Sequence, residues 1–116
     1  MDWGLFDSFF EGASFEEHEK LVELLESQKE VAFDTETTSL DIDEAELLGI
    51  SFCFEKNKAF YAAFPYSKVE IKPYISLYKN FFSSSCVKIA HNIKYDQGVL
   101  KNYNINIDGP VYDTMI

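Results

Sequence analysis

The sequence has few basic residues, few cysteines and no long apolar run. Lysine and arginine together number 10 against 20 aspartates and glutamates, which gives a formal net charge of −10 over 116 residues. A protein that grips nucleic acid by neutralising phosphates needs a basic patch, so this composition argues against that class of binder. It leaves open a metal-dependent enzyme, because carboxylates that hold divalent metals can receive a phosphodiester through those metals.

The small number of cysteines and the lack of membrane-span or signal-peptide patterns indicate the cellular compartment of the protein. Cys53 and Cys86 lie in apolar runs, which is typical of packed thiols in a reducing cytosol; a single disulfide between them is the alternative. No apolar run reaches the roughly 18 residues of a membrane span, and no basic-then-apolar signal peptide opens the chain. We therefore expect a soluble, cytoplasmic protein with no membrane partner.

The sequence does contain enough apolar surface for one folded domain. It is 47% hydrophobic and 16% aromatic, and its length suits one core rather than two. Residues 1–13 are aromatic-rich without a clear period, and we expect them to form an N-terminal extension to a domain at residues 14–116. Ser14 and Glu17 have the spacing of a capping box, which predicts that a helix begins directly after Ser14.

Strand and helix patterns alternate along the domain. We expect helices at 15–28, 70–84 and 92–102, and strands at 30–34, 47–54, 58–65, 87–90 and 111–112. The second and third strands are joined by a short turn and predict a hairpin. A hairpin followed by strands that alternate with helices predicts an α/β fold, with helices against the faces of a mixed sheet. Functional sites in such sheets collect at strand ends.

The segment VAFDTETTSL, residues 31–40, ends a buried strand with two carboxylates on one side. Successive side chains of a strand alternate faces, so Asp34 and Glu36 point the same way and Thr35 points the other way. Two carboxylates this close repel unless they share a cation, and hard oxygen ligands suit magnesium or manganese. The alternative is a strand end that reaches solvent, with Asp34 capping a turn. A metal site needs a third ligand.

The best third ligand lies in KIAHNIKYDQ, residues 88–97. A strand ends here and a helix begins, and Asn92 and Asp96 share one helical face because they are four residues apart. They are expected at the same sheet edge as Asp34. The alternative is that Asn92 is an N-cap and Asp96 an exposed acid favoured by the helix dipole. We expect His91 to be a boundary residue rather than a metal ligand.

These two segments, together with VYDTMI at residues 111–116, resemble the first two motifs of a known nuclease family. The family is the proofreading 3′–5′ exonuclease domain of bacterial family-A DNA polymerases of the polymerase I type, within the DEDD exonuclease superfamily. The similarity runs from about residue 30 to the end. The resemblance implies an RNase H-like mixed sheet flanked by helices. It also implies that two divalent ions, Mg²⁺ or Mn²⁺, support hydrolysis of 3′-terminal nucleotides from DNA.

The resemblance assigns roles to individual residues. It makes Asp34 and Glu36 the metal ligands of the first motif and Asp96 the acid of the second, so these three are the implied catalytic carboxylates. Leu40 stands where the family has an apolar wedge against the terminal base, and His91 stands where the family commonly has glutamine. Contacts with the single-stranded 3′ end of DNA are implied for Thr35, Thr37, Leu40, His91 and Asn92.

A third motif is absent from the sequence. DEDD enzymes need a fourth carboxylate and a tyrosine or histidine that orients the attacking water, and both come from a motif downstream of the second. We therefore expect a domain truncated before the third motif, inactive alone, and joined to a polymerase domain in the full-length protein. Asp113, in the YDTM segment, is expected to be structural or to support the ligands rather than to replace the missing acid.

Two other functions fit parts of the sequence. A catalytically inert, exonuclease-like scaffold domain would keep the fold, but such domains usually lose the acids of the first motif, which this chain retains. A haloacid-dehalogenase-type phosphatase also has a strand that ends in D-x-[DE]-x-T. That family uses aspartate at the second acidic position, and its later lysine and glycine–aspartate pair are not found here.

Overall fold

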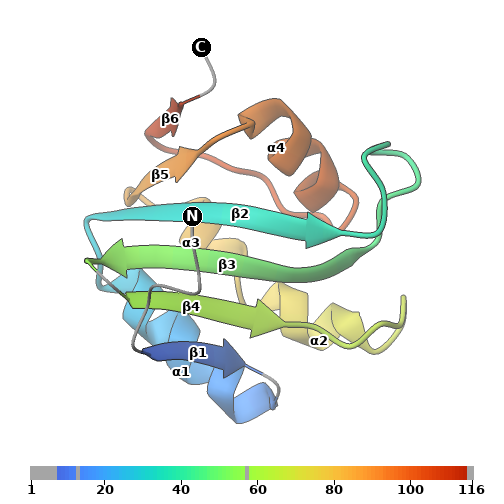
Figure 1. Cartoon of the computed structure of the whole chain (residues 1–116), viewed down its shortest axis with the longest axis horizontal. Coiled ribbons are helices and arrows are strands. Elements are labelled where there is room, and N and C mark those ends of the chain that lie inside the picture. The colour runs from blue at the N-terminus through green and yellow to red at the C-terminus, as the bar shows by residue number, and fades with distance from the viewer. Residues whose placement is uncertain (1–7, 13, 57, 115–116) are drawn as a thin grey trace.

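The computed structural model describes residues 8–12, 14–56 and 58–114, which form a six-stranded sheet and four helices (Figure 1). The elements in chain order are β1 (Ser8–Gly12), α1 (Phe15–Glu26), β2 (Glu30–Thr37), β3 (Leu47–Glu55), β4 (Lys58–Ala63), α2 (Ile71–Ser76), α3 (Lys79–Phe82), β5 (Val87–Ala90), α4 (Ile93–Lys101) and β6 (Val111–Asp113).

The strand order in the sheet is β1-β4-β3-β2-β5-β6. Strands β2, β3 and β4 pair antiparallel, whereas β1 with β4, β2 with β5, and β5 with β6 pair in parallel. The predicted mixed α/β sheet is confirmed.

The first strand is an element that the sequence did not predict. Residues 8–12 pair in parallel with β4 at the edge of the sheet, from Ser8 opposite Lys58 to Gly12 opposite Ala62. This pairing depends on a partner strand far away in the sequence, so no local period announces it. The remainder of the predicted extension, residues 1–7 and 13, lies outside the described residues, and the domain boundary at residue 14 stays a prediction.

Two other elements differ from the expected ones by more than two residues. Strand β2 continues to Thr37 instead of ending at Asp34, because β3 pairs with it antiparallel as far as Leu47. The helix expected at 70–84 is divided into α2 and α3. The amides of Leu77 and Tyr78 bond to carbonyls three residues back, at 3.2 and 3.1 Å, and this tighter turn separates the two short helices.

The helix α1 begins as its sequence predicts. The side chain of Ser14 accepts a hydrogen bond from the amide of Glu17, and the Glu17 carboxylate returns to the Ser14 backbone, which completes the capping box. Both Cys53 and Cys86 are free thiols, in agreement with the packed-thiol interpretation. None of the described helices combines the length and the apolar character needed to cross a membrane.

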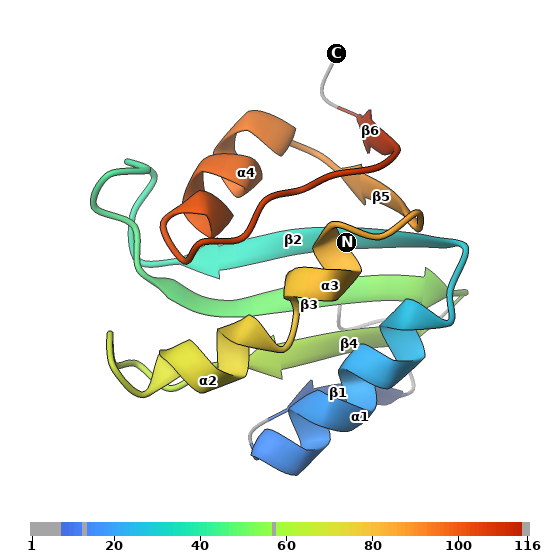
Figure 2. The same ribbon diagram turned by 180° about the vertical axis from the view of Figure 1, so that it is seen from behind.

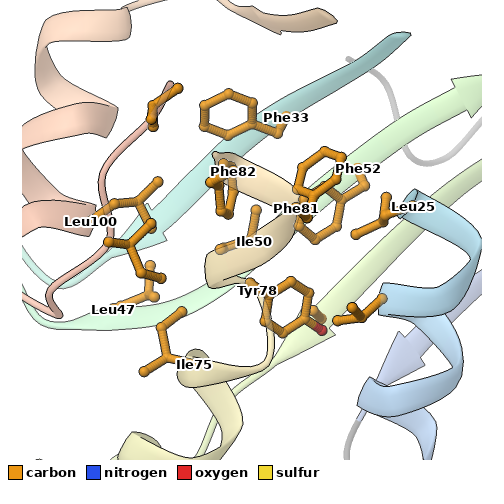
Figure 3. Close-up of a cluster of buried hydrophobic side chains, with 14 of the residues drawn as sticks. Leu25, Phe33, Leu47, Ile50, Phe52, Ile75, Tyr78, Phe81, Phe82 and Leu100 are labelled. Atoms are coloured by element: carbon orange, nitrogen blue, oxygen red, sulfur yellow. The ribbon is translucent and has the colours of Figure 1, made fainter. Parts of the chain in front are cut away.

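The hydrophobic core lies against one face of the sheet and includes buried side chains of α1, α2, α3 and α4 (Figure 2). Aromatic rings dominate it. Phe52 of β3 stacks on Tyr78 with ring centroids 5.7 Å apart, and Phe33 of β2 meets Phe82 edge-on at 5.1 Å (Figure 3). No described helix covers the opposite face of β2, β3 and β4 (Figure 1). The side chains of β2 therefore alternate between a packed face and an open one.

A polar pair lies inside this core. His18 of α1 has no exposed surface, and its ring stacks on Phe64 at a centroid distance of 5.0 Å. The Nε2 atom of His18 lies 2.8 Å from the carbonyl oxygen of Ala63, which can only accept, so Nε2 carries the proton. The Nδ1 atom then accepts from the hydroxyl of Tyr78 at 2.6 Å. Burial raises the pKa of Tyr78, which keeps this donor protonated.

We expect Tyr78→Phe to destabilise the fold through His18. The substitution keeps the ring in the core but leaves the buried Nδ1 without its donor, which costs about 1–3 kcal/mol of unfolding free energy. Urea unfolding followed by circular dichroism measures the loss. Tyr74→Phe is the matched control, because Tyr74 touches His18 by an edge-on ring contact. Equal stability of Tyr78→Phe and the unmodified chain would contradict this account.

Candidate active site

The site forms where β5 separates from β2. The parallel pairing of these strands ends at Ala32 opposite Ile89, while β2 continues to Thr37 along β3. Beyond Ala32, the side of β2 that faced β5 has no strand partner among the described residues. The chain after β5 turns into α4 at this place (Figure 1). A crevice at the carboxyl end of a parallel strand is the usual position of a site in such a sheet.

Asp34 and Glu36 lie on the open face of the sheet. Along β2 the buried residues are Val31, Phe33 and Thr35, whereas Asp34 and Glu36 are exposed. The predicted alternation is therefore present, although Asp34 lies within the strand and not at its end. Both carboxylates are available to solvent, and neither is used to hold the core.

Asp96 reaches the same place from α4 but is buried. The side chain of Asn92 accepts a hydrogen bond from the amide of Tyr95 at 3.4 Å, so Asn92 is the N-cap that starts the helix. Asp96 is 2% exposed, which differs from the exposed first-turn acid of the alternative interpretation. Its Oδ1 accepts a hydrogen bond of 2.6 Å from the hydroxyl of Thr35.

The carboxylates influence one another by charge. Burial raises the pKa of Asp96 to about 6; the hydrogen bond from Thr35 opposes this rise, and the negative charges of Asp34 and Asp113 add to it. Burial likewise raises the pKa of Asp34, while the nearby His91 lowers it. Acids of β2 and β6 thus lie close enough to Asp96 of α4 to disfavour its charged form.

The donor set fits a hard divalent cation in part. Asp34 and Asp96 are neighbouring carboxylates, and their oxygen atoms are the ligands that a hard divalent ion prefers. Within the described residues, however, no three His, Cys, Asp or Glu side chains are grouped so that they could hold a metal ion. The structure therefore brings Asp34 and Asp96 together without adding Glu36 to a common group, and the ligand role of Glu36 stays a prediction.

The residues expected to contact a substrate are distributed around the loop after β2. Leu40, at the proposed wedge position, is 93% exposed. The hydroxyl of Thr37 donates to the carbonyl oxygen of Ser39 at 2.9 Å. Thr35 is buried and engaged with Asp96, which separates it from the open face. His91 is exposed and pairs through Nδ1 with the hydroxyl of Thr114 at 3.2 Å, next to Asp113. The substrate contacts themselves stay predictions.

Helix α4 fixes this loop through residues that the sequence analysis did not single out. The hydroxyl of Tyr95 donates to the carbonyl oxygen of Ser39 at 2.5 Å and also pairs with the Thr37 hydroxyl. The side-chain amide of Asn102 donates a hydrogen bond to the backbone carbonyl oxygen of Ile42 at 2.9 Å. Gly98 lies under the Ile42 side chain. Residues 95, 98 and 102 share one helical face by their spacing, and this was the signal available in the sequence.

Comparison with known protein families places this geometry in context. A family model described as 3′–5′ exonuclease matches residues 14–116. The chain is similar to DNA polymerase I of Borreliella burgdorferi, with 36% identity over 103 residues that cover 86% of this chain and 11% of the relative. It is also similar to DNA polymerase I of Pseudomonas aeruginosa, with 32% identity over 101 residues, 79% of this chain and 11% of the relative.

The fold is similar to that of other nucleases. The crystal structure of Trypanosoma brucei RNase D superposes with a TM-score of 0.72 and 17% identity, over 90% of this chain and 37% of that chain. This likeness supports the RNase H-like fold that the family resemblance implied. The chain spans only about a tenth of the curated polymerases that it matches, 11% in each case.

We expect Asp96→Asn to stabilise the metal-free protein above pH 6. The pKa of Asp96 is about 6 in the folded chain and about 3.9 when unfolded, so the folded state holds more protons between these values and the free energy of unfolding falls as pH rises through them. Asparagine removes this titration and keeps an oxygen acceptor for Thr35. The variant should match the unmodified chain below pH 4 and exceed it by about 1–3 kcal/mol above pH 6.5.

Urea unfolding at several pH values, with a chelator present, measures the difference. Asp43→Asn is the control, because Asp43 is exposed in the loop between β2 and β3. An unmodified chain whose stability follows the same pH course as Asp96→Asn would show that Asp96 titrates normally.

Proposed function

Because the chain belongs to the 3′–5′ exonuclease family that DNA polymerase I carries, we propose that it serves as a proofreading domain that removes 3′-terminal nucleotides from DNA. The observation that carries this proposal is that Asp34 of β2 lies near enough to Asp96 of α4, a distant segment of the sequence, for its negative charge to raise the pKa of Asp96. The full-length protein would add a polymerase domain and act in the bacterial cytoplasm, in DNA replication and repair.

The acids of this chain would hold the ions on which the reaction depends. When bound, a pair of Mg²⁺ or Mn²⁺ ions activates water and stabilises the leaving 3′ oxygen. Asp34 and Glu36 on β2 and Asp96 on α4 supply the carboxylates that this role requires. The exposed position of Asp34 and Glu36 leaves them open to a phosphodiester, while the buried Asp96 is held from behind by Thr35.

The loop after β2 would receive the end of the DNA strand. Leu40 offers a nearly fully exposed apolar side chain, and α4 fixes the backbone on both sides of it through Tyr95 and Asn102. Stacking of a base on such a side chain needs no base-edge contacts, so the domain would act without sequence preference. Thr37, His91 and Asn92 are the other residues that we propose to contact the terminal nucleotide.

We expect the 116-residue chain to bind Mn²⁺ weakly and Asp34→Ala to abolish that binding, because the exposed carboxylate supplies a ligand that no neighbour replaces. Electron paramagnetic resonance of free Mn²⁺ measures the affinity. Asp43→Ala removes one negative charge from the neighbouring loop and should leave binding nearly unchanged. Equal losses in Asp34→Ala and Asp43→Ala would indicate a diffuse charge effect and contradict a site at Asp34.

The same chain should degrade single-stranded DNA from the 3′ end little or not at all. A group that acts only in the transition state typically contributes orders of magnitude in rate, and residues 1–116 supply no fourth acid of the third motif. A polypeptide that extends through the third motif should be active. Rapid hydrolysis by residues 1–116 that depends on Asp34 would show instead that an acid within them completes the site, and Asp113 would be the first to test.

We expect Leu40→Ala to weaken binding of a single-stranded 3′ end by about 5- to 100-fold, the range that follows from the roughly 1–3 kcal/mol of one base stacked on a side chain. Fluorescence anisotropy with a labelled oligonucleotide and Mn²⁺ measures the affinity. Leu24→Ala is the matched control, since Leu24 is an exposed leucine on α1, away from the loop. Similar affinities for both variants would remove Leu40 from the substrate site.

A further inference from the structure

Thr35 stands between the two acids of the FDTET segment but points away from them. Its side chain is 8% exposed, on the packed face of β2, whereas Asp34 and Glu36 are exposed on the other face. The Thr35 hydroxyl therefore cannot share a ligand with its two neighbours in the sequence. It donates instead to Oδ1 of Asp96, at 2.6 Å, across 61 residues of sequence.

This hydrogen bond is a direct side-chain link between the strand of the first motif and the acid of the second. Asp96 is buried, and a buried carboxylate without a hydrogen bond is costly. Its orientation is therefore set by the donor that satisfies it.

We propose that Thr35 is a positioning residue, which fixes the carboxylate of Asp96 for a divalent cation shared with Asp34. This inference rests on the proposed function, because it concerns the same metal site. Groups that hydrogen-bond a metal-ligating carboxylate orient it, and their removal typically lowers metal affinity by about 10- to 100-fold. Thr35 acts through Asp96 and takes no part in contacts with the substrate.

The side chain of threonine suits this position for two reasons. Its β-branch restricts rotation about χ1 in a strand, so the hydroxyl is held in one direction. Its methyl group fills apolar space on the packed face, where Ile50 is its cross-strand partner. Valine has nearly the same shape without the donor, and serine has the donor without the methyl group. The two substitutions therefore separate the hydrogen bond from the packing.

The test compares Mn²⁺ affinity, by electron paramagnetic resonance, in the unmodified 116-residue chain and in variants at two threonines. We expect Thr35→Val to weaken binding by about 10- to 100-fold and Thr35→Ser to restore it close to the unmodified value. Thr38→Val is the matched control, because it removes a hydroxyl directly after the same strand, one that accepts a hydrogen bond from the backbone amide of Glu46. It should leave Mn²⁺ affinity nearly unchanged.

Each result decides for or against the proposal. Unchanged affinity in Thr35→Val, or an equal loss in Thr35→Ser, would overturn it, since the hydroxyl would then not be the cause. Circular dichroism confirms that each variant is folded at the temperature used. If Thr35→Val does not fold, Thr35→Ala replaces it, because its smaller side chain admits water beside Asp96. If the unmodified chain itself binds no Mn²⁺, the proposed function fails and this inference fails with it.

Discussion

The register of β2 against β3 is the constraint on which the site depends. Phe33 of β2 lies opposite Phe52 of β3, and both rings enter the aromatic core beneath α3. Because side chains along a strand alternate with a period of two, this pairing places Asp34 and Glu36 on the open face. A slip by one residue would bury both acids and expose Phe33. The burial of aromatic rings thus fixes the direction of the carboxylates, with no contribution from the carboxylates themselves.

The two coupled acids differ in environment, and this difference has a chemical use. Asp34 is exposed and can approach a phosphodiester, whereas Asp96 is buried behind it and satisfied by Thr35. The negative charge of Asp34 raises the pKa of Asp96. Two ionised carboxylates close together are less stable without a bound cation than with a cation between them. The protein therefore carries an electrostatic penalty in the metal-free state that a divalent ion would relieve.

The sequence was sufficient to predict the elements whose signals are local. The apolar runs of β2 and β5, the capping box of α1 and the alternation at residues 34–36 depend on neighbours in the chain, and each is found in the structure. The parallel edge strand β1 and the extension of β2 to Thr37 depend on pairing with distant strands, so no local pattern announced them. The hydrogen bond between Thr35 and Asp96 likewise joins segments that are distant in the sequence. The alternation showed that Thr35 faces away from the acids, but only the packing of α4 on β2 shows what it meets.

Helix α4 combines the two halves of the proposed site in one rigid body. One side of it presents Asp96 to Thr35, and the adjacent side, through Tyr95 and Asn102, holds the loop that carries Leu40. A β-carbon at Gly98 would lie 2.8 Å from Cδ1 of Ile42, so a larger residue there would displace the end of that side chain. The distance between the acid and the wedge is then set by the helix and not by a flexible connection. In the proposed exonuclease, this fixed spacing would align a terminal phosphodiester with the carboxylates.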